Sequence, residues 1–211
     1  MYCGATEKLT QEHTPPKLVF PEPRPSDLIT VRACLQCNQD GSMDAEYFRV
    51  CLCLNPITKD MPSVLGLQPT VQRSLQRPNG QGLKARLLQA MEPDHGMIAL
   101  NVEMGRIHMV IRRVVQCLYV HETGTRLPDT HESRVASNEV LSHFGPEKVE
   151  EFRNLFVEPL VQQEWKVVAA GQFAYSVIHT NRPFVSVWGL VFYGVLPFVG
   201  FTGRRVRLSD E

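Results

Sequence analysis

Two cysteines three positions apart form the strongest chemical signal in the sequence. Cys34 and Cys37 make a C-x-x-C motif behind a short apolar run, and this spacing lets both thiolates reach one tetrahedral zinc ion from a tight turn. The motif also serves thiol–disulfide exchange, but there it opens a helix after a parallel strand. Here Asn-Gln-Asp-Gly follows, which is typical of a turn, so metal binding is the favoured interpretation.

A third thiol lies about thirty residues upstream of this motif. Cys3 is followed by Gly4, a small residue of the kind that lets the backbone turn sharply behind a zinc ligand. We therefore expect Cys3, Cys34 and Cys37 to hold a structural Zn²⁺.

The other three cysteines do not share this pattern. Cys51 and Cys53 are two residues apart on a predicted helix, so their side chains point in different directions and cannot chelate one ion together. We expect both, together with Cys117, to lie in the hydrophobic core. Six cysteines without a recognisable secretory signal favour a reducing compartment, and a cytoplasmic protein is the default expectation.

Polar residues with catalytic potential lie between and behind the cysteines. Glu12-His13 precedes two prolines, and Asn38 directly follows Cys37. An acidic segment, "DAEYFR", begins at Asp44 and includes Glu46.

Taken together, the segments "YCG", "EHTPPK", "DLITV", "ACLQCN" and "DAEYFR" resemble the HNH endonucleases of the ββα-metal class. More narrowly, the set resembles bacterial proteins with C-x-Y-C-G, EH-x-P-P-K, AC-x-x-CN and DEEYFR in this order. The resemblance covers about residues 2–52, and its motifs are specific as a set. It implies a small zinc-stabilised ββα-metal module that hydrolyses phosphodiester bonds in nucleic acid, with DNA as the expected partner.

The resemblance also implies a role for each polar residue. His13 corresponds to the general base that activates water, Glu12 to a ligand of the catalytic cation, and Asn38 to the asparagine that orients the histidine. The second ligand of the family is often a helix histidine; here Glu46 is the nearest candidate and Asp44 is its rival. A carboxylate suits a hard cation such as Mg²⁺ or Mn²⁺.

Two departures from the family pattern leave a second function open. The helix histidine is replaced by an acid, and only one cysteine stands in the first knuckle. Both favour the alternative of a non-catalytic, zinc-stabilised module that binds nucleic acid or protein on a degenerate HNH scaffold. Because the absent cysteine of C-x-Y-C-G would fall just before Met1, we also expect the native chain to begin upstream.

Composition neither supports nor opposes a nucleic-acid partner. The 211 residues include 22 basic and 22 acidic side chains, so any phosphate-binding surface must be a local patch. Four cations of the first module could form such a patch or be ordinary solvated charges: Lys17, Arg24, Arg32 and Arg49. The most apolar stretch, residues 184–201, contains three glycines and a proline, so it predicts buried strands rather than a membrane span.

The pattern of the chain predicts an α+β fold in two parts. Residues 1–55 form the HNH-like module, ending in a helix over 42–54 that Ser42 caps and Asn55-Pro56 stops. Residues 56–211 form an α+β domain with no assigned role. We expect helices over 83–91 and 104–121, the second ended by Gly124, then a loop over 127–133 and an antiparallel meander from Trp165 onward. His121-Glu122 is read as a helix-end cap.

Overall fold

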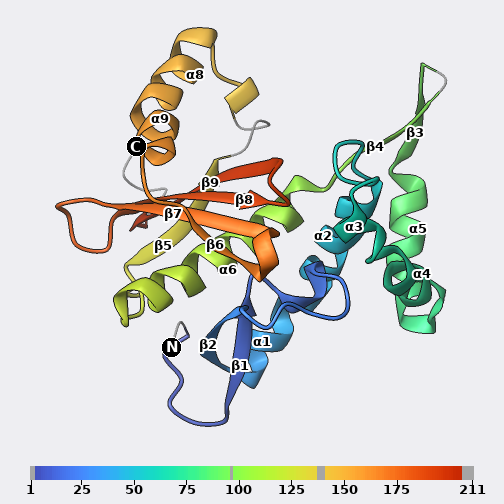
Figure 1. The fold of residues 1–211 in the computed structure, drawn as a ribbon, viewed down its shortest axis with the longest axis horizontal. Helices are drawn as coiled ribbons and strands as arrows, with labels where there is room; N and C mark the ends of the chain where they lie inside the picture. Colours follow the sequence, from blue (N-terminus) through green and yellow to red (C-terminus); the bar gives the residue numbers. More distant parts are fainter. Residues whose placement is uncertain (1–2, 96, 137–140, 206–211) are drawn as a thin grey trace.

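The computed structural model describes residues 3–95, 97–136 and 141–205, and it has the expected α+β architecture (Figure 1). The chain begins with an antiparallel hairpin of β1 (Leu9–Thr14) and β2 (Ile29–Cys34). Two helices follow without a strand between them, α1 (Leu35–Asp40) and α2 (Ser42–Leu54). The strand and the α2 helix confirm the elements expected in residues 28–54, although Gly41 rather than Ser42 is the residue before α2.

Short helices and a second hairpin connect α2 to the rest of the chain. They are α3 (Pro62–Leu65), α4 (Gln68–Gln76), the single turn η2 (Pro78–Gly80), α5 (Gln81–Gln89), β3 (Met91–Asp94) and β4 (Met97–Leu100). In Figure 1 these elements lie beside α2, at the side of the molecule away from α8 and α9. Among them, α5 overlaps the helix expected over 83–91.

The longest helix, α6 (Met104–Thr123), runs through the middle of the molecule (Figure 1). Its apolar residues recur with the period of a helix, so one continuous face is buried. Gly124 ends the helix in the left-handed conformation, with φ of 69°, which glycine adopts without steric cost. Within the described part of the chain, no helix is long and apolar enough to cross a membrane.

A five-stranded antiparallel sheet forms most of the C-terminal part. Its order is β5 (His131–Ala136), β9 (Leu196–Arg204), β8 (Ser186–Phe192), β7 (Phe173–His179) and β6 (Lys166–Val168). The strands β6 to β9 form the meander expected after Trp165, and residues 184–201 lie largely in β8 and β9, as predicted.

Helices cover both faces of this sheet (Figure 1). α6 packs against one face, where Gly200 of β9 lies so close to the helix that an added Cβ would be 2.4 Å from Val115 Cγ2. The other face is covered by α8 (Pro146–Phe152), a π-helical turn η3 (Arg153–Val157) and α9 (Glu158–Val161). There Phe201 of β9 contacts the rings of Phe152 and Phe156.

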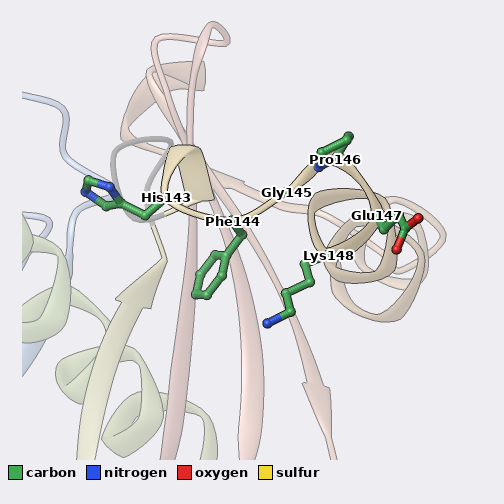
Figure 2. Close-up of a pocket in the computed structure, with 6 residues that line it drawn as sticks. All are labelled: His143, Phe144, Gly145, Pro146, Glu147 and Lys148. Atoms are coloured by element: carbon green, nitrogen blue, oxygen red, sulfur yellow. The ribbon is translucent and has the colours of Figure 1, made fainter.

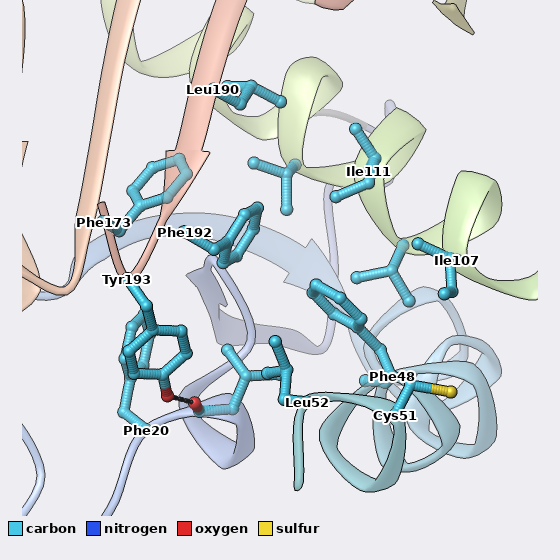
Figure 3. Packing of buried hydrophobic residues seen from close by; sticks show 14 of the residues in the cluster. Phe20, Phe48, Cys51, Leu52, Ile107, Ile111, Phe173, Leu190, Phe192 and Tyr193 are labelled. Carbon is cyan, nitrogen blue, oxygen red and sulfur yellow. Dashed lines mark hydrogen bonds between the residues drawn. The ribbon is translucent and has the colours of Figure 1, made fainter. Parts of the chain in front are cut away.

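One hydrophobic core joins the two parts of the chain that the sequence analysis separated. Phe48 of α2 packs edge-on against Phe192 of the sheet with ring centroids 5.2 Å apart, and Ile107 of α6 belongs to the same cluster (Figure 3). The Tyr193 hydroxyl donates a hydrogen bond to the carbonyl oxygen of Val19, in the single helical turn η1 (Lys17–Val19) (Figure 3). The N-terminal hairpin and helix are therefore packed on the body by buried apolar contact.

Three local expectations were wrong. The turn expected after Cys37 is the helix α1, because the Cys34 Sγ accepts the backbone N–H of Cys37 and so caps a helix. The end of the loop expected over 127–133 is instead the start of β5, an edge strand paired with β9. Glu122 does not act mainly as a helix cap: its carboxylate accepts hydrogen bonds from Lys166 Nζ and the Tyr175 hydroxyl, which joins α6 to the sheet.

This Glu122 cluster predicts a pH-dependent part of the stability. Burial alone would raise the pKa of Glu122, but the hydrogen bonds from Lys166 and Tyr175 and the charge of Lys166 outweigh it and lower the pKa. A lowered folded-state pKa stabilises the protein above the pKa of the unfolded chain, and that stability is lost as the pH falls through the folded value. We expect Glu122→Gln to lower the free energy of unfolding by about 1.5–3 kcal/mol at pH 7, measured by urea denaturation.

The difference between Glu122→Gln and wild type should shrink as the pH falls from about 5 to about 3. Glu164→Gln, at an exposed position, is the matched control and should change the free energy of unfolding by less than about 0.5 kcal/mol. A Glu122→Gln effect that stays constant over this pH range would contradict the assignment.

Candidate metal centre and the site around His13

The β1–β2 hairpin brings three cysteine thiols together. Leu9 pairs with Cys34 across the strands, so the end of β2 lies beside the segment that enters β1 from Cys3. The Sγ atoms of Cys3, Cys34 and Cys37 all lie within 4.8 Å of one another. In the described residues this is the one group of three or more His, Cys, Asp or Glu side chains whose ligand atoms are this close. These three cysteines can bind a metal ion.

Backbone hydrogen bonds hold the sulfur atoms in this arrangement. The N–H of Cys34 donates to the Cys3 Sγ at 3.3 Å, and the N–H of Cys37 donates to the Cys34 Sγ at 3.4 Å. A tetrahedral zinc site with Zn–S bonds of about 2.3 Å requires sulfur atoms about 3.8 Å apart. The observed group therefore fits three corners of such a site with small side-chain adjustments.

The thiols differ in acidity although they are neighbours. Burial opposes ionisation of Cys3, but hydrogen bonds from the backbone of Cys34 and Ala5 outweigh it and lower the pKa. Burial, hydrogen bonding with Cys34 and the charge of Cys3 together raise the pKa of Cys37 to about 12. Three adjacent thiolates repel one another, and a bound cation is the ordinary means by which proteins neutralise such a cluster.

Asn38 fixes α1 against the first strand. Its side-chain amide donates to the Thr10 hydroxyl at 3.0 Å and to the Gln11 carbonyl at 3.1 Å. These acceptors are two and three residues before His13, so the contact of Asn38 is with the strand that positions the histidine.

His13 lies near the end of β1, opposite Thr30, and its side chain is half-buried. Burial lowers the pKa of His13, and the nearby positive charges of Lys17 and Arg24 lower it further. The imidazole is therefore mainly neutral at pH 7, in the form that accepts a proton. Lys17 and Arg24 lie on the segment that follows β1, where Arg24 pairs with Glu22 at 2.8 Å.

Glu12 points to the opposite face of the hairpin from His13, because consecutive strand residues alternate. Its side chain is 7% exposed and pairs with the Arg113 guanidinium of α6 at 2.7 Å. Gly41, between α1 and α2, leaves room for this arginine, since an added Cβ would lie 1.7 Å from Arg113 Nη1. Arg113 is a site residue that the sequence analysis missed; its partner is 101 positions away, and nothing in the local pattern indicates it.

The two acidic candidates on α2 are also paired with arginines. Glu46 contacts Arg49 at 3.3 Å and accepts a hydrogen bond from the Ser74 hydroxyl of α4. Asp44 pairs with Arg106 of α6 at 2.8 Å. Among the residues that the structure describes, no group of three close metal-ligating side chains includes Glu12, Asp44 or Glu46.

The basic residues proposed for a phosphate-binding patch divide into two classes. Lys17 and Arg32 are exposed and Arg24 is partly exposed, whereas Arg49 is 7% exposed and packs inside the protein. Burial lowers the pKa of Arg49, with the charge of Glu46 opposing this shift. The Arg49 side chain is therefore packed inside the protein and does not form part of an exposed basic surface.

Comparison with known proteins does not assign a function to this chain. No family model, no curated protein and no solved structure matches this chain. The functional proposal therefore rests on the local geometry of the hairpin, its thiols and its polar side chains.

The buried Glu12–Arg113 pair should be a strong link between the hairpin and α6. Arg113→Met keeps most of the aliphatic stem but removes the charge, which deprives the buried Glu12 carboxylate of its guanidinium. We expect this change to lower the free energy of unfolding by about 3 kcal/mol, measured by urea denaturation at pH 7.

The exposed Arg77→Met change is the matched control, with an expected effect below about 0.5 kcal/mol. In Glu12→Gln/Arg113→Met the total loss should be clearly smaller than the sum of the two single losses, because the variants remove one shared interaction. Strict additivity would show that the pair contributes no coupling.

Proposed function

We propose that the chain is a metal-dependent nuclease of the HNH type, with His13 as general base in hydrolysis of a phosphodiester bond. The observation that supports this most is the hairpin itself: one short strand positions His13, and its start lies beside the three-thiol group. Nucleic acid, with DNA as the first choice, is the proposed substrate because Lys17 and Arg24 put positive charge beside His13.

The proposed chemistry of His13 follows from its environment. A neutral imidazole can take a proton from a water molecule as that water attacks the phosphorus atom. The adjacent cations favour the approach of a phosphate group, and Asn38 keeps the strand before His13 attached to α1. Asn38 is thus proposed as a positioning residue.

The three thiols are proposed to hold a structural Zn²⁺. Sulfur ligands and the tetrahedral spacing suit zinc, and the ion would fasten the entry of β1 to the start of α1. Cys3, Cys34 and Cys37 would supply three ligands, which leaves the fourth position for a water molecule or another side chain.

A second, catalytic cation is the most demanding part of the proposal. Glu12 and Glu46 are the carboxylates proposed to hold Mg²⁺ or Mn²⁺, and oxygen donors suit either ion. When bound, such an ion would neutralise the charge that develops on the phosphate and the leaving oxygen. Each carboxylate is paired with an arginine, and Glu12 faces away from His13. Cation binding beside His13 would therefore have to replace the contacts with Arg113 and Arg49 and reorient the Glu12 side chain.

The same ion pairs favour a second candidate function. If Glu12 and Glu46 remain with their arginines, the module holds structural zinc but no catalytic cation. It would then bind nucleic acid or protein without cleaving it. Calorimetric titration with Mn²⁺ distinguishes the two functions: saturable binding that Glu12→Gln removes supports the nuclease, and no binding supports the non-catalytic module.

Cleavage of plasmid and single-stranded DNA with Mg²⁺ or Mn²⁺ tests the proposed activity directly. We expect the purified chain to cleave at least one of these substrates, and His13→Ala to lower the rate by at least about 100-fold through loss of the general base. His143→Ala, at an exposed position away from the hairpin, is the matched control and should keep the wild-type rate.

The proposal fails if the wild-type chain leaves both substrates intact, or if His13→Ala and His143→Ala cleave equally well. Circular dichroism of both variants should match the wild type, so that a lost rate is not a lost fold.

A further inference from the structure

We propose that a large apolar cavity between α2, α6, α8 and β9 is a binding site for an uncharged apolar small molecule. The cavity has a volume of about 1040 Å³. It is separate from the three-thiol group and from His13, none of which contribute to its lining. The proposal is therefore independent of the nuclease function.

The walls of this cavity come from elements far apart in the sequence. α2 contributes Phe48 and Leu52, α6 contributes Ile107, and the β3–β4 hairpin contributes Leu100. The sheet side is formed by β9, including Phe198. Figure 3 shows Phe48, Leu52 and Ile107 within the core cluster, so one wall of the cavity is the rigid core itself.

The size of the cavity is that of a ligand site. Interiors of proteins are close-packed and contain few voids larger than one water molecule. Sites for small molecules have volumes of about 300–1,000 Å³ and are mostly apolar, with a few polar groups. The volume of about 1040 Å³ matches the upper end of this range.

A second depression in the protein has a different character. It has a volume of about 300 Å³ and is lined by six consecutive residues, from His143 to Lys148 (Figure 2). It includes charged Glu147 and Lys148, and all six residues are exposed. This depression is formed by one exposed segment, whereas the large cavity is a half-open groove whose walls come from several elements.

The charge of the large cavity determines the class of ligand. Among its described lining residues Arg153 is the only charged one, and its Nε donates to the Glu158 carboxylate at 3.0 Å. The other described lining residues are uncharged and mostly apolar, which favours an uncharged ligand. Asn55 is the one amide in the lining, so a ligand with a single polar group has a partner.

Apolar side chains at the rim support an occupant. Four large apolar residues that line the cavity are exposed to solvent: Leu54, Ile57, Val149 and Val195. Ile57 is 63% exposed, and its neighbours Leu54 and Pro56 in the lining are exposed as well. A bound apolar molecule would cover part of this surface and gain the free energy of removing it from water.

Titration of the whole chain with Nile red, an uncharged dye whose emission shifts in apolar surroundings, tests the proposal. We expect saturable binding of about one dye per chain. Val195→Trp places a large side chain at the rim, and Leu100→Trp fills the interior; each should weaken binding at least tenfold. Val167→Trp, at an exposed valine on β6 outside the lining, is the matched control and should change the affinity less than twofold.

Other outcomes would overturn the proposal. Dye binding that does not saturate, or that the three variants affect equally, would show non-specific adsorption. Sedimentation that reveals a dimer abolished by Val195→Trp, with no dye binding, would assign the surface to a second copy of the chain. Because Val195 and Val167 are exposed, neither valine substitution should prevent folding.

Discussion

Burial of α6 from several sides is the interaction on which the remaining structure depends. The helix packs against the hairpin and α2 with one part of its surface and against β5 and β9 with another. Val31 of the hairpin meets Cys117 and Val120, while Gly200 of the sheet allows close contact with Val115. A helix of 20 residues with this apolar face could not be stable alone, because its stability comes from tertiary packing.

The same helix supplies charges to the acidic residues of the N-terminal elements. Arg113 reaches Glu12 on β1, and Arg106 reaches Asp44 on α2. These pairs explain how residues 56–211 take part in the environment of the candidate site without contributing a recognisable motif. These pairs also limit cation binding by Glu12. A carboxylate buried beside a guanidinium binds a metal cation only if the cation replaces the guanidinium.

Local patterns predicted most of the helices and strands but not the contacts between them. The period of apolar residues from Met104 onward predicted α6, and Gly124 predicted its end. The C-x-x-C spacing and the upstream Cys3 predicted a three-thiol group, and the β1–β2 hairpin brings these thiols together. A residue with a strong conformational preference therefore allows local structure to be predicted from the sequence alone.

Other features of the structure depend on contacts between residues that are far apart in the sequence, so local patterns could not indicate them. β5 pairs with β9, although the turn formers Pro128 and Asp129 lie just before it. Glu122 at the end of α6 meets Lys166 and Tyr175 of the sheet, and such tertiary partners override a local preference for capping. The apolar cavity is lined by residues between Phe48 and Val199, so it can be recognised only in the folded chain.

Metal content of the purified chain is the most direct test of the three-thiol centre that holds the hairpin to α1. We expect about one zinc per chain by mass spectrometry, loss of this zinc in Cys37→Ser, and full retention in Cys53→Ala, whose thiol lies in the core. A wild-type chain without zinc, or a Cys37→Ser chain with as much zinc as wild type, would contradict the centre.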